Sequence, residues 1–289
     1  NGNDGSSFYG HVFGNGKASI AGGGGSGNVN ININVTPDKN SEIVYDISSP
    51  ETVGGHDFIH WTSRDTLTTA NDSLKRQAAQ TDDDIPTNIH LNFLINTTPD
   101  ATLRIIMDRQ SGDYIALNGS GTLRANWFNK GSMDIFGTYT ISSGTYKLTI
   151  QNIIKKAFNF ADGGTIVFGG NPMNAQLHLS AVYPIASVSL SDLQIGRSFS
   201  SNNTRVNCLM NITGTPSAPK VDFNLDFPSL DADAKQMIYS LISSEEQMNQ
   251  QVLYLLAVGR FYTESSNNAQ AQSTNQTSLA MQSILSGQI

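Results

Sequence analysis

Residues 163–183 read GGTIVFGGNPMNAQLHLSAVY, and this stretch decides the fold. Apolar residues alternate with polar ones on both sides of a central Gly-Gly-Asn-Pro turn. An alternation with a period of two places the apolar side chains on one face of a β-sheet. The stretch therefore predicts two strands joined by a turn, with one apolar face. It carries no convincing nucleophile, metal-ligand cluster or phosphate-binding loop, so the function must explain that face in another way.

The same alternation of strands and turns extends from residue 8 to about residue 227. HVFGNGKASIAG, NVNININV and GTYKLTIQNII are strand-like, and the turns carry Gly or Asn-Lys-Gly, which suit the positive φ of hairpins. No window in this span has helical periodicity. We expect a mainly β protein built on a long antiparallel sheet, in which each strand pairs with the next. Residues 62–86, which are rich in Thr and Asp, predict a polar loop insert.

A helical pattern begins after Pro228. Ser244 and Gln247 fit a capping box, and Gly259 is placed to end the helix. The run VLYLLAV is apolar on every side but too short to cross a bilayer, so it must pack on the sheet or on a partner. The predicted units are a sheet domain at residues 1–227, a helical segment at 228–264, and a flexible linker with the start of a further short helix at 265–289.

Composition excludes some classes of function. Only 14% of the 289 residues are charged, the net charge is −7, and no Lys/Arg stripe is present, so a nucleic-acid partner is not expected. The single cysteine, Cys208, excludes an internal disulfide. Its context, RVNCLMNI, favours a small apolar strand residue over a reactive thiol. The sequence opens in a strand-like stretch, so we expect any targeting segment to lie upstream.

Each candidate for chemistry has a simpler structural explanation. His56 and His60 lie in a strand-like stretch, where a spacing of four residues spans roughly 13 Å, too far for one ion. TDDDIP lacks the ligand spacing of an EF-hand. AGGGGSGN precedes a strand rather than a helix, and no helix follows the Ser of NGSGT. Paired acids brought together from distant strands stay open. We expect no catalytic residue, no metal and no cofactor, and therefore no enzyme.

A series of weak motifs in fixed order carries a resemblance to a known family. The motifs are NTTPDATLRIIMDRQSGDYIALNGSGTLR, GSMDIFGTYTISSGTYKLTIQNIIKKAFNFADGGTIVFGGNPMNAQLHLSAVY, NCLMNITG, FNLDFPSLD and QVLYLLAVGRFY. In this order they resemble the C-terminal domain of the TamB family, in the form found in Bacteroidetes. The Gly22–Gly25 run and the insert at 62–86 are longer than the family pattern.

The resemblance implies a β-taco, a long sheet curled into an open trough lined with apolar side chains. It also implies a periplasmic location, with an inner-membrane anchor upstream and the C-terminal end at the outer membrane. The partner would be a BamA/TamA-like outer-membrane barrel. The family is linked to outer-membrane protein assembly and to phospholipid passage between the membranes, which makes phospholipid the expected ligand.

The residues that line the trough are predicted from strand parity. An apolar face of this size needs a cover, and acyl chains are a plausible one, because each buried CH₂ contributes roughly 0.8 kcal/mol. The predicted lining is Leu91, Phe93, Ile95, Leu103, Ile105, Met107, Leu148, Ile150, Ile166, Phe168, Leu177, Leu179, Met210, Ile212, Phe223 and Leu225.

The contact with the barrel partner is predicted in the helical segment, at Val252, Leu255, Leu256, Arg260 and Tyr262. Two alternatives stay open. In the first, the sheet is a closed core without lipid and the chain is a structural docking module. In the second, the chain is a surface β-solenoid or adhesin, which predicts a fixed repeat length that is not found.

Overall fold

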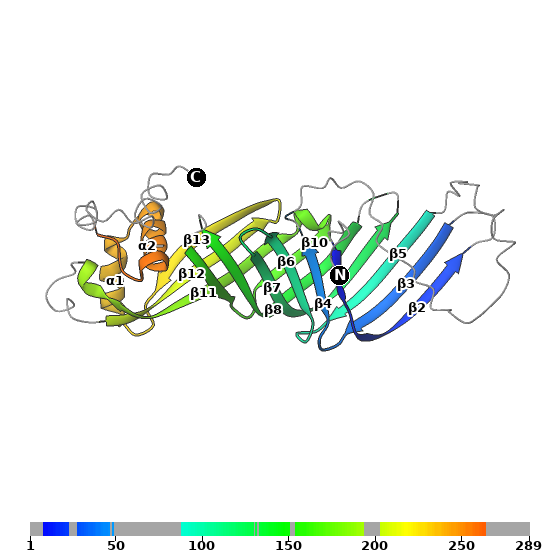
Figure 1. Ribbon diagram of the computed structural model, residues 1–289, viewed down its shortest axis with the longest axis horizontal. Helices are drawn as coiled ribbons and strands as arrows, with labels where there is room; N and C mark the ends of the chain where they lie inside the picture. The colour runs from blue at the N-terminus through cyan, green and yellow to red at the C-terminus, as the bar shows by residue number, and fades with distance from the viewer. Residues whose placement is uncertain are drawn as a thin grey trace.

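The computed structural model describes residues 8–22, 28–46, 48, 88–129, 131, 133–150, 154–193 and 203–263. It confirms a mainly β protein with short C-terminal helices (Figure 1). The strands form one sheet of 13 strands, and the helices lie at one end of it. The predicted insert at 62–86, the stretch 265–289, His56 and His60 lie outside the described residues.

The strands follow one another along the chain with few other elements between them. Their bounds are β1 Phe8–His11, β2 Gly14–Gly22, β3 Asn28–Pro37, β4 Glu42–Asp46, β5 Asn88–Thr97, β6 Thr102–Asp108, β7 Asp113–Phe128, β8 Met133–Ile150, β9 Ile154–Phe160, β10 Thr165–Gly170, β11 Gln176–Ser189, β12 Asn203–Thr215 and β13 Ala218–Asp226.

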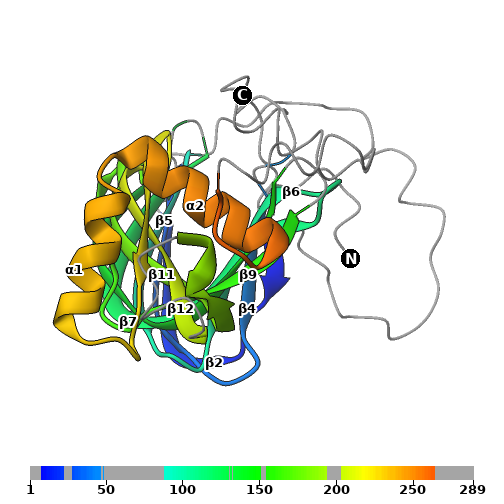
Figure 2. The same ribbon diagram turned by 90° about the vertical axis from the view of Figure 1, so that its left-hand side faces the viewer.

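Several consecutive strands act together as one bent strand. β5 pairs with residues 121–128 of β7, and β6 pairs with residues 113–118 of the same strand. In the same way β9 and β10 both pair with β8 on one side and with β11 on the other. Each bent unit therefore spans both walls of a sheet that is folded along its length, which Figure 2 shows from one end. This is the curled sheet that the family resemblance implies.

The sheet is mixed rather than purely antiparallel. β3 pairs with β5 in parallel, and β4 pairs with β6 in parallel, whereas the other pairings are antiparallel. Parallel neighbours need a long connection, and residues 47–87 supply it. Two pairs of asparagines then lie side by side. The Asn88 amide donates to Asn28 (2.7 Å), and the Asn92 amide donates to Asn32 (3.0 Å). The expectation that each strand pairs with the next fails here.

Polar side chains from neighbouring strands hold two of the bends. The Asn118 amide nitrogen donates to the carbonyls of Pro99 and Ala101 and to the Thr102 hydroxyl, at 2.9–3.1 Å. Ser41, which lies between β3 and β4, holds the bend between β1 and β2. Its hydroxyl donates to the Phe13 carbonyl (2.8 Å) and accepts from the Phe13 amide (3.0 Å).

The C-terminal helices close one end of the folded sheet. Ser244 and Gln247 form the predicted capping box of the second helix, and Gly259 ends it in the left-handed conformation (φ 75°). In Figure 2 this helix lies across the end of the sheet. The bounds are η1 Pro172–Asn174, η2 Leu190–Leu193, α1 Ala232–Leu241 and α2 Glu245–Val258.

Candidate functional site

The predicted apolar residues share one continuous face. Residues that pair directly across two strands point to the same side of the sheet. Successive pairs cross the sheet from β5 to β13 without a change of side: Ile95 with Leu123, Ala125 with Ile135, Tyr139 with Ile166, Ile166 with Leu177, Leu179 with Ile212, and Met210 with Phe223. On the β6 wall, Leu103 pairs with Leu117 and Ile105 with Ile115.

The opposite face of the sheet is largely polar. Asn32 and Asn34 of β3 are exposed, as are Arg124 and Asn126 of β7, and these residues alternate with the apolar ones on the same strands. The sheet is therefore amphipathic, as the period of two predicts. Its apolar side is the candidate site.

Exposure of the apolar face changes along the sheet. Near the helices it is closed: Ile141, Val206 and Cys208 are completely buried, and Met210 and Leu225 are 1% exposed. They form one cluster with side chains of α1 and α2. Towards β5 and β6 the face is more open.

At that open end the predicted lining residues Phe93, Ile95, Leu103 and Ile105 are only half-buried. Met107, at the end of β6, is 37% exposed, whereas Leu91 is buried. Leu148, Phe168 and Phe223 are half-buried and pack against the closed cluster. The side chain of Ile150 lies outside the described residues.

A family model described as the TamB C-terminal domain matches residues 7–289. The chain belongs to this family. No curated protein matches it. The TamB family is the family of a translocation and assembly module, and the chain has a TamB-like role in such a module.

Three of the residues predicted to contact a partner are inside the core of this TamB domain. Val252, Leu255 and Leu256 of α2 are at most 1% exposed and pack with the sheet residues of the closed end. In this conformation they offer no surface to a partner, so that part of the prediction is corrected. The physical reason is that α2 supplies the cover that the apolar face needs at this end.

The other two predicted contact residues follow α2. Arg260 is exposed and forms an ion pair with Asp192 of η2. Tyr262 is half-buried, and its ring packs edge-on against Tyr254 at 5.6 Å. The Gln251 side chain accepts from the Tyr262 amide (2.9 Å) and donates to its carbonyl (3.1 Å). The segment after α2 is thereby fixed to the helix.

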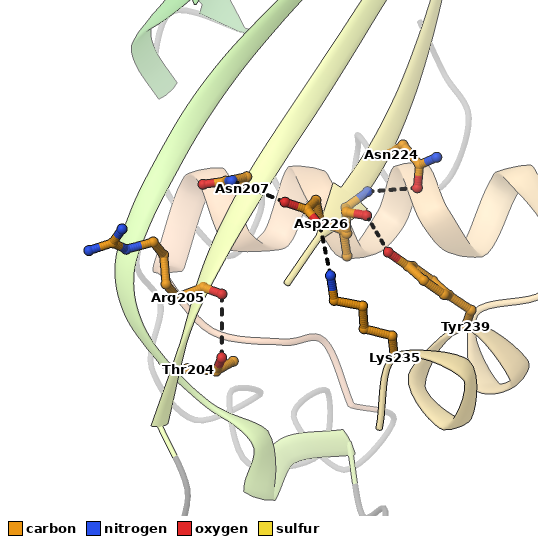
Figure 3. Close-up of polar contacts among 8 residues, drawn as sticks. Thr204, Arg205, Asn207, Asn224, Asp226, Lys235 and Tyr239 are labelled. Carbon is orange, nitrogen blue, oxygen red and sulfur yellow. Dashed lines mark hydrogen bonds and ion pairs between the residues drawn. The ribbon is translucent and has the colours of Figure 1, made fainter. Parts of the chain in front are cut away.

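Helix α1 is fastened to the edge strand of the TamB sheet (Figure 3). The Tyr239 hydroxyl donates to the Leu225 carbonyl (2.9 Å), and Lys235 reaches the Asp226 carboxylate (3.4 Å). Asp226 also accepts from the Asn207 amide (3.2 Å). These contacts satisfy part of the strand edge, which would otherwise invite pairing with another chain.

Exposed apolar side chains surround the helical end, and the sequence analysis missed them. Met237 and Leu241 on α1 are 42% and 48% exposed, and Val258 at the end of α2 is 41% exposed. A spacing of four residues places Met237 and Leu241 on the same side of α1, which could have signalled this patch. We call Met237 and Leu241 the helical patch; Val258 lies at the C-terminal end of the other helix.

Cys208 is a buried strand residue, as its context predicts. Burial raises the pKa of its thiol to about 12, and the charge of Lys156 acts in the opposite direction. Within the part of the chain that the structure describes, no His, Cys, Asp and Glu side chains gather into a group that could hold a metal ion. The described helices include none with the length and apolar character needed to span a membrane.

Proposed function

We propose that this TamB domain forms an apolar conduit for phospholipid acyl chains, and for apolar segments of outer-membrane proteins, within the translocation and assembly module. The observation that supports the proposal most is the exposure gradient of the apolar face. The face is continuous from β5 to β13, yet it is only half-buried at the β5 and β6 end. A closed core of a globular domain would be buried throughout.

The energetics of acyl chains suit such a surface. Each CH₂ removed from water contributes roughly 0.8 kcal/mol, so covering four of them gives about 3 kcal/mol. No directional contact is needed, and a chain can therefore move along the face without losing a strong bond at each step. Half-buried side chains such as Phe93 and Ile105 provide the area that an acyl chain would cover.

The proposed partner is a BamA/TamA-like outer-membrane barrel, with the domain in the periplasm and an inner-membrane anchor upstream. We place the contact with the barrel at the helical patch of Met237 and Leu241, because these apolar side chains are accessible. Arg260 and Tyr262, which follow α2, can contribute to the contact together with the exposed Val258.

A structural docking module is the second candidate. The observation in its favour is the dense packing of the closed end, where side chains from β11, β12, β13 and α2 are buried together. In that case the half-buried end would be covered by protein rather than lipid.

The experiment compares lipids retained by the purified protein, measured by mass spectrometry. Ile105→Lys places a charge on the apolar face, and Ile106→Lys places the same charge on the opposite face of the same strand, where Ile106 is equally half-buried. The conduit predicts phospholipid on the wild type and on Ile106→Lys, and its loss from Ile105→Lys. If the folded wild type retains no lipid, the docking module is favoured.

A further inference from the structure

Of the lysines that the structure describes, one lies on the apolar face of the sheet. Lys156 of β9 pairs with Leu148 of β8, and two residues further along Phe158 pairs with Tyr146. Phe158 is completely buried in the closed cluster. Because residues two apart on a strand point to the same side, Lys156 points to the apolar side as well. A cation at such a position is costly unless it has a partner.

Among the described residues, Lys156 has a tyrosine beside it and no carboxylate within ion-pair distance. Its Nζ donates to the Tyr183 hydroxyl at 3.3 Å and lies 5.1 Å from the centre of the same ring. The Tyr183 ring packs against Phe158 at 5.7 Å. None of the ion pairs among the described residues includes Lys156. The ammonium group therefore keeps donors for an anion.

Lys156 lies near the start of its strand, at the edge of the sheet. β9 begins at Ile154, only two residues earlier, and its neighbour β8 ends at Ile150. Lys156 is half-buried, whereas Phe158 and Phe160, further along β9, are buried. A molecule lying across this wall would meet the cation at the edge and the half-buried Leu148 and Tyr146 of β8 beside it.

We propose that Lys156 and Tyr183 bind the phosphate of a phospholipid whose acyl chains lie on the apolar face. This inference rests on the proposed conduit and adds the position and charge of the headgroup. The Tyr183 oxygen accepts from Lys156, which leaves its own O–H free to donate to a phosphate oxygen. Lys156 supplies a second, charge-assisted donor. The site thereby selects an anionic headgroup over an uncharged one with the same chains.

The test compares two short-chain lipids that differ only in the headgroup, dioctanoyl phosphatidylglycerol and dioctanoylglycerol. Their affinities are measured by displacement of the uncharged apolar dye N-phenyl-1-naphthylamine. The variants are Lys156→Gln and, as the matched control, Lys155→Gln, which removes an exposed lysine on the opposite face of the same strand. Circular dichroism confirms that each variant is folded.

We expect the wild type and Lys155→Gln to bind phosphatidylglycerol about tenfold more tightly than dioctanoylglycerol. Lys156→Gln should lose that preference and keep its affinity for the dye. Tyr183→Phe, which keeps the ring, should reduce the preference as well, and it replaces Lys156→Gln if that variant does not fold. If the preference for phosphatidylglycerol survives in the folded Lys156→Gln or Tyr183→Phe variant, the proposed headgroup site at Lys156 and Tyr183 is overturned.

Two further outcomes separate this inference from the proposal on which it rests. If neither the dye nor dioctanoylglycerol binds to the wild type, the proposed conduit is contradicted. The headgroup site, which rests on it, is then contradicted as well. If inorganic phosphate displaces phosphatidylglycerol at equal concentration, the site binds phosphate without regard to the acyl chains, and the headgroup anchor is overturned.

Discussion

Arg260 and Asp192 are 68 residues apart in the sequence, and two parallel hydrogen bonds join them. The guanidinium Nε and Nη2 donate to the two carboxylate oxygens of Asp192 at 3.1 and 2.8 Å. This bidentate geometry is the more specific form of an ion pair. It joins the residue after the Gly259 cap of α2 to η2, which follows β11. The helix that covers the closed end of the sheet is therefore fastened at its C-terminal end.

Arg260→Gln should make the closed end open more often. The pair is largely exposed on the arginine side, so its contribution is at most about 1 kcal/mol, which corresponds to about a fivefold change in the open population. Cys208 is buried in the same cluster as α2, and its alkylation by iodoacetamide under native conditions reports that opening. Lys220→Gln, which removes a more exposed cation on β13, is the control. Equal alkylation rates in the two variants would show that the pair does not fasten the helix.

Leu255→Ala should destabilise the fold by about 2–5 kcal/mol, because it removes a buried side chain from the closed cluster. Val258→Ala on the same helix removes an exposed apolar side chain and should change the free energy of unfolding by no more than about 0.5 kcal/mol. Urea unfolding measures both. A small loss for Leu255→Ala would mean that α2 is not part of the core.

Removal of residues 229–289 should give an insoluble protein. The truncation removes the α1 and α2 side chains from the closed cluster and exposes the sheet residues that pack against them, and an exposed apolar face promotes aggregation. The soluble fraction of the truncated protein, measured by sedimentation after expression, is compared with that of the protein of 289 residues. A soluble truncated domain with intact sheet content would contradict the role of the helices as a cover.

Stability should fall as the pH rises above about 9. Burial raises the pKa of Cys208 to about 12 from an ordinary value of 9.0. Between these values the unfolded chain loses the thiol proton and the folded chain keeps it, so a higher pH favours unfolding. From pH 9 to pH 10 the loss is about 1 kcal/mol. Urea unfolding of the wild type and of Cys208→Ala at both pH values should show this difference between the proteins; parallel losses would contradict it.

Asn118→Ala should weaken the bend between β5 and β6. The Asn118 amide bonds to three acceptors from the preceding bent unit, and their loss should cost about 1–2 kcal/mol. Ser120→Ala, at an exposed position on the same strand, serves as the control. Thermal unfolding measures the difference, and equal melting temperatures would mean that the bend is set by the backbone alone.

Strand parity predicted the apolar face well, because the period of two depends only on local geometry. The pair Ile166 and Leu177, read from adjacent strands, lies in direct register. The capping box at Ser244 was equally local and is confirmed. Lys156 was within reach of the same rule, because it lies two and four residues before Phe158 and Phe160 and so shares their side of the strand.

Strand order and the cover of the face could not be predicted in this way. Periodicity states which side a residue faces and not which strand lies beside it, so the parallel pairing of β3 with β5 was missed. The sextets INVTPD at 33–38 and INTTPD at 95–100, which end these two strands, were a usable signal of structural repetition. An apolar run such as VLYLLAV fits burial on its own sheet as well as on a partner, and only the three-dimensional structure separates the two.

Photo-crosslinking from adjacent positions of β5 tests the conduit most directly. Phe93 faces the apolar side and Leu94 the opposite side, and both are half-buried apolar residues. p-Benzoylphenylalanine is placed at either position in the protein expressed in cells, and lipid adducts are counted by mass spectrometry after illumination. The conduit predicts phospholipid adducts at position 93 and few at position 94. Equal yields at the two positions, or protein adducts alone at position 93, would contradict it.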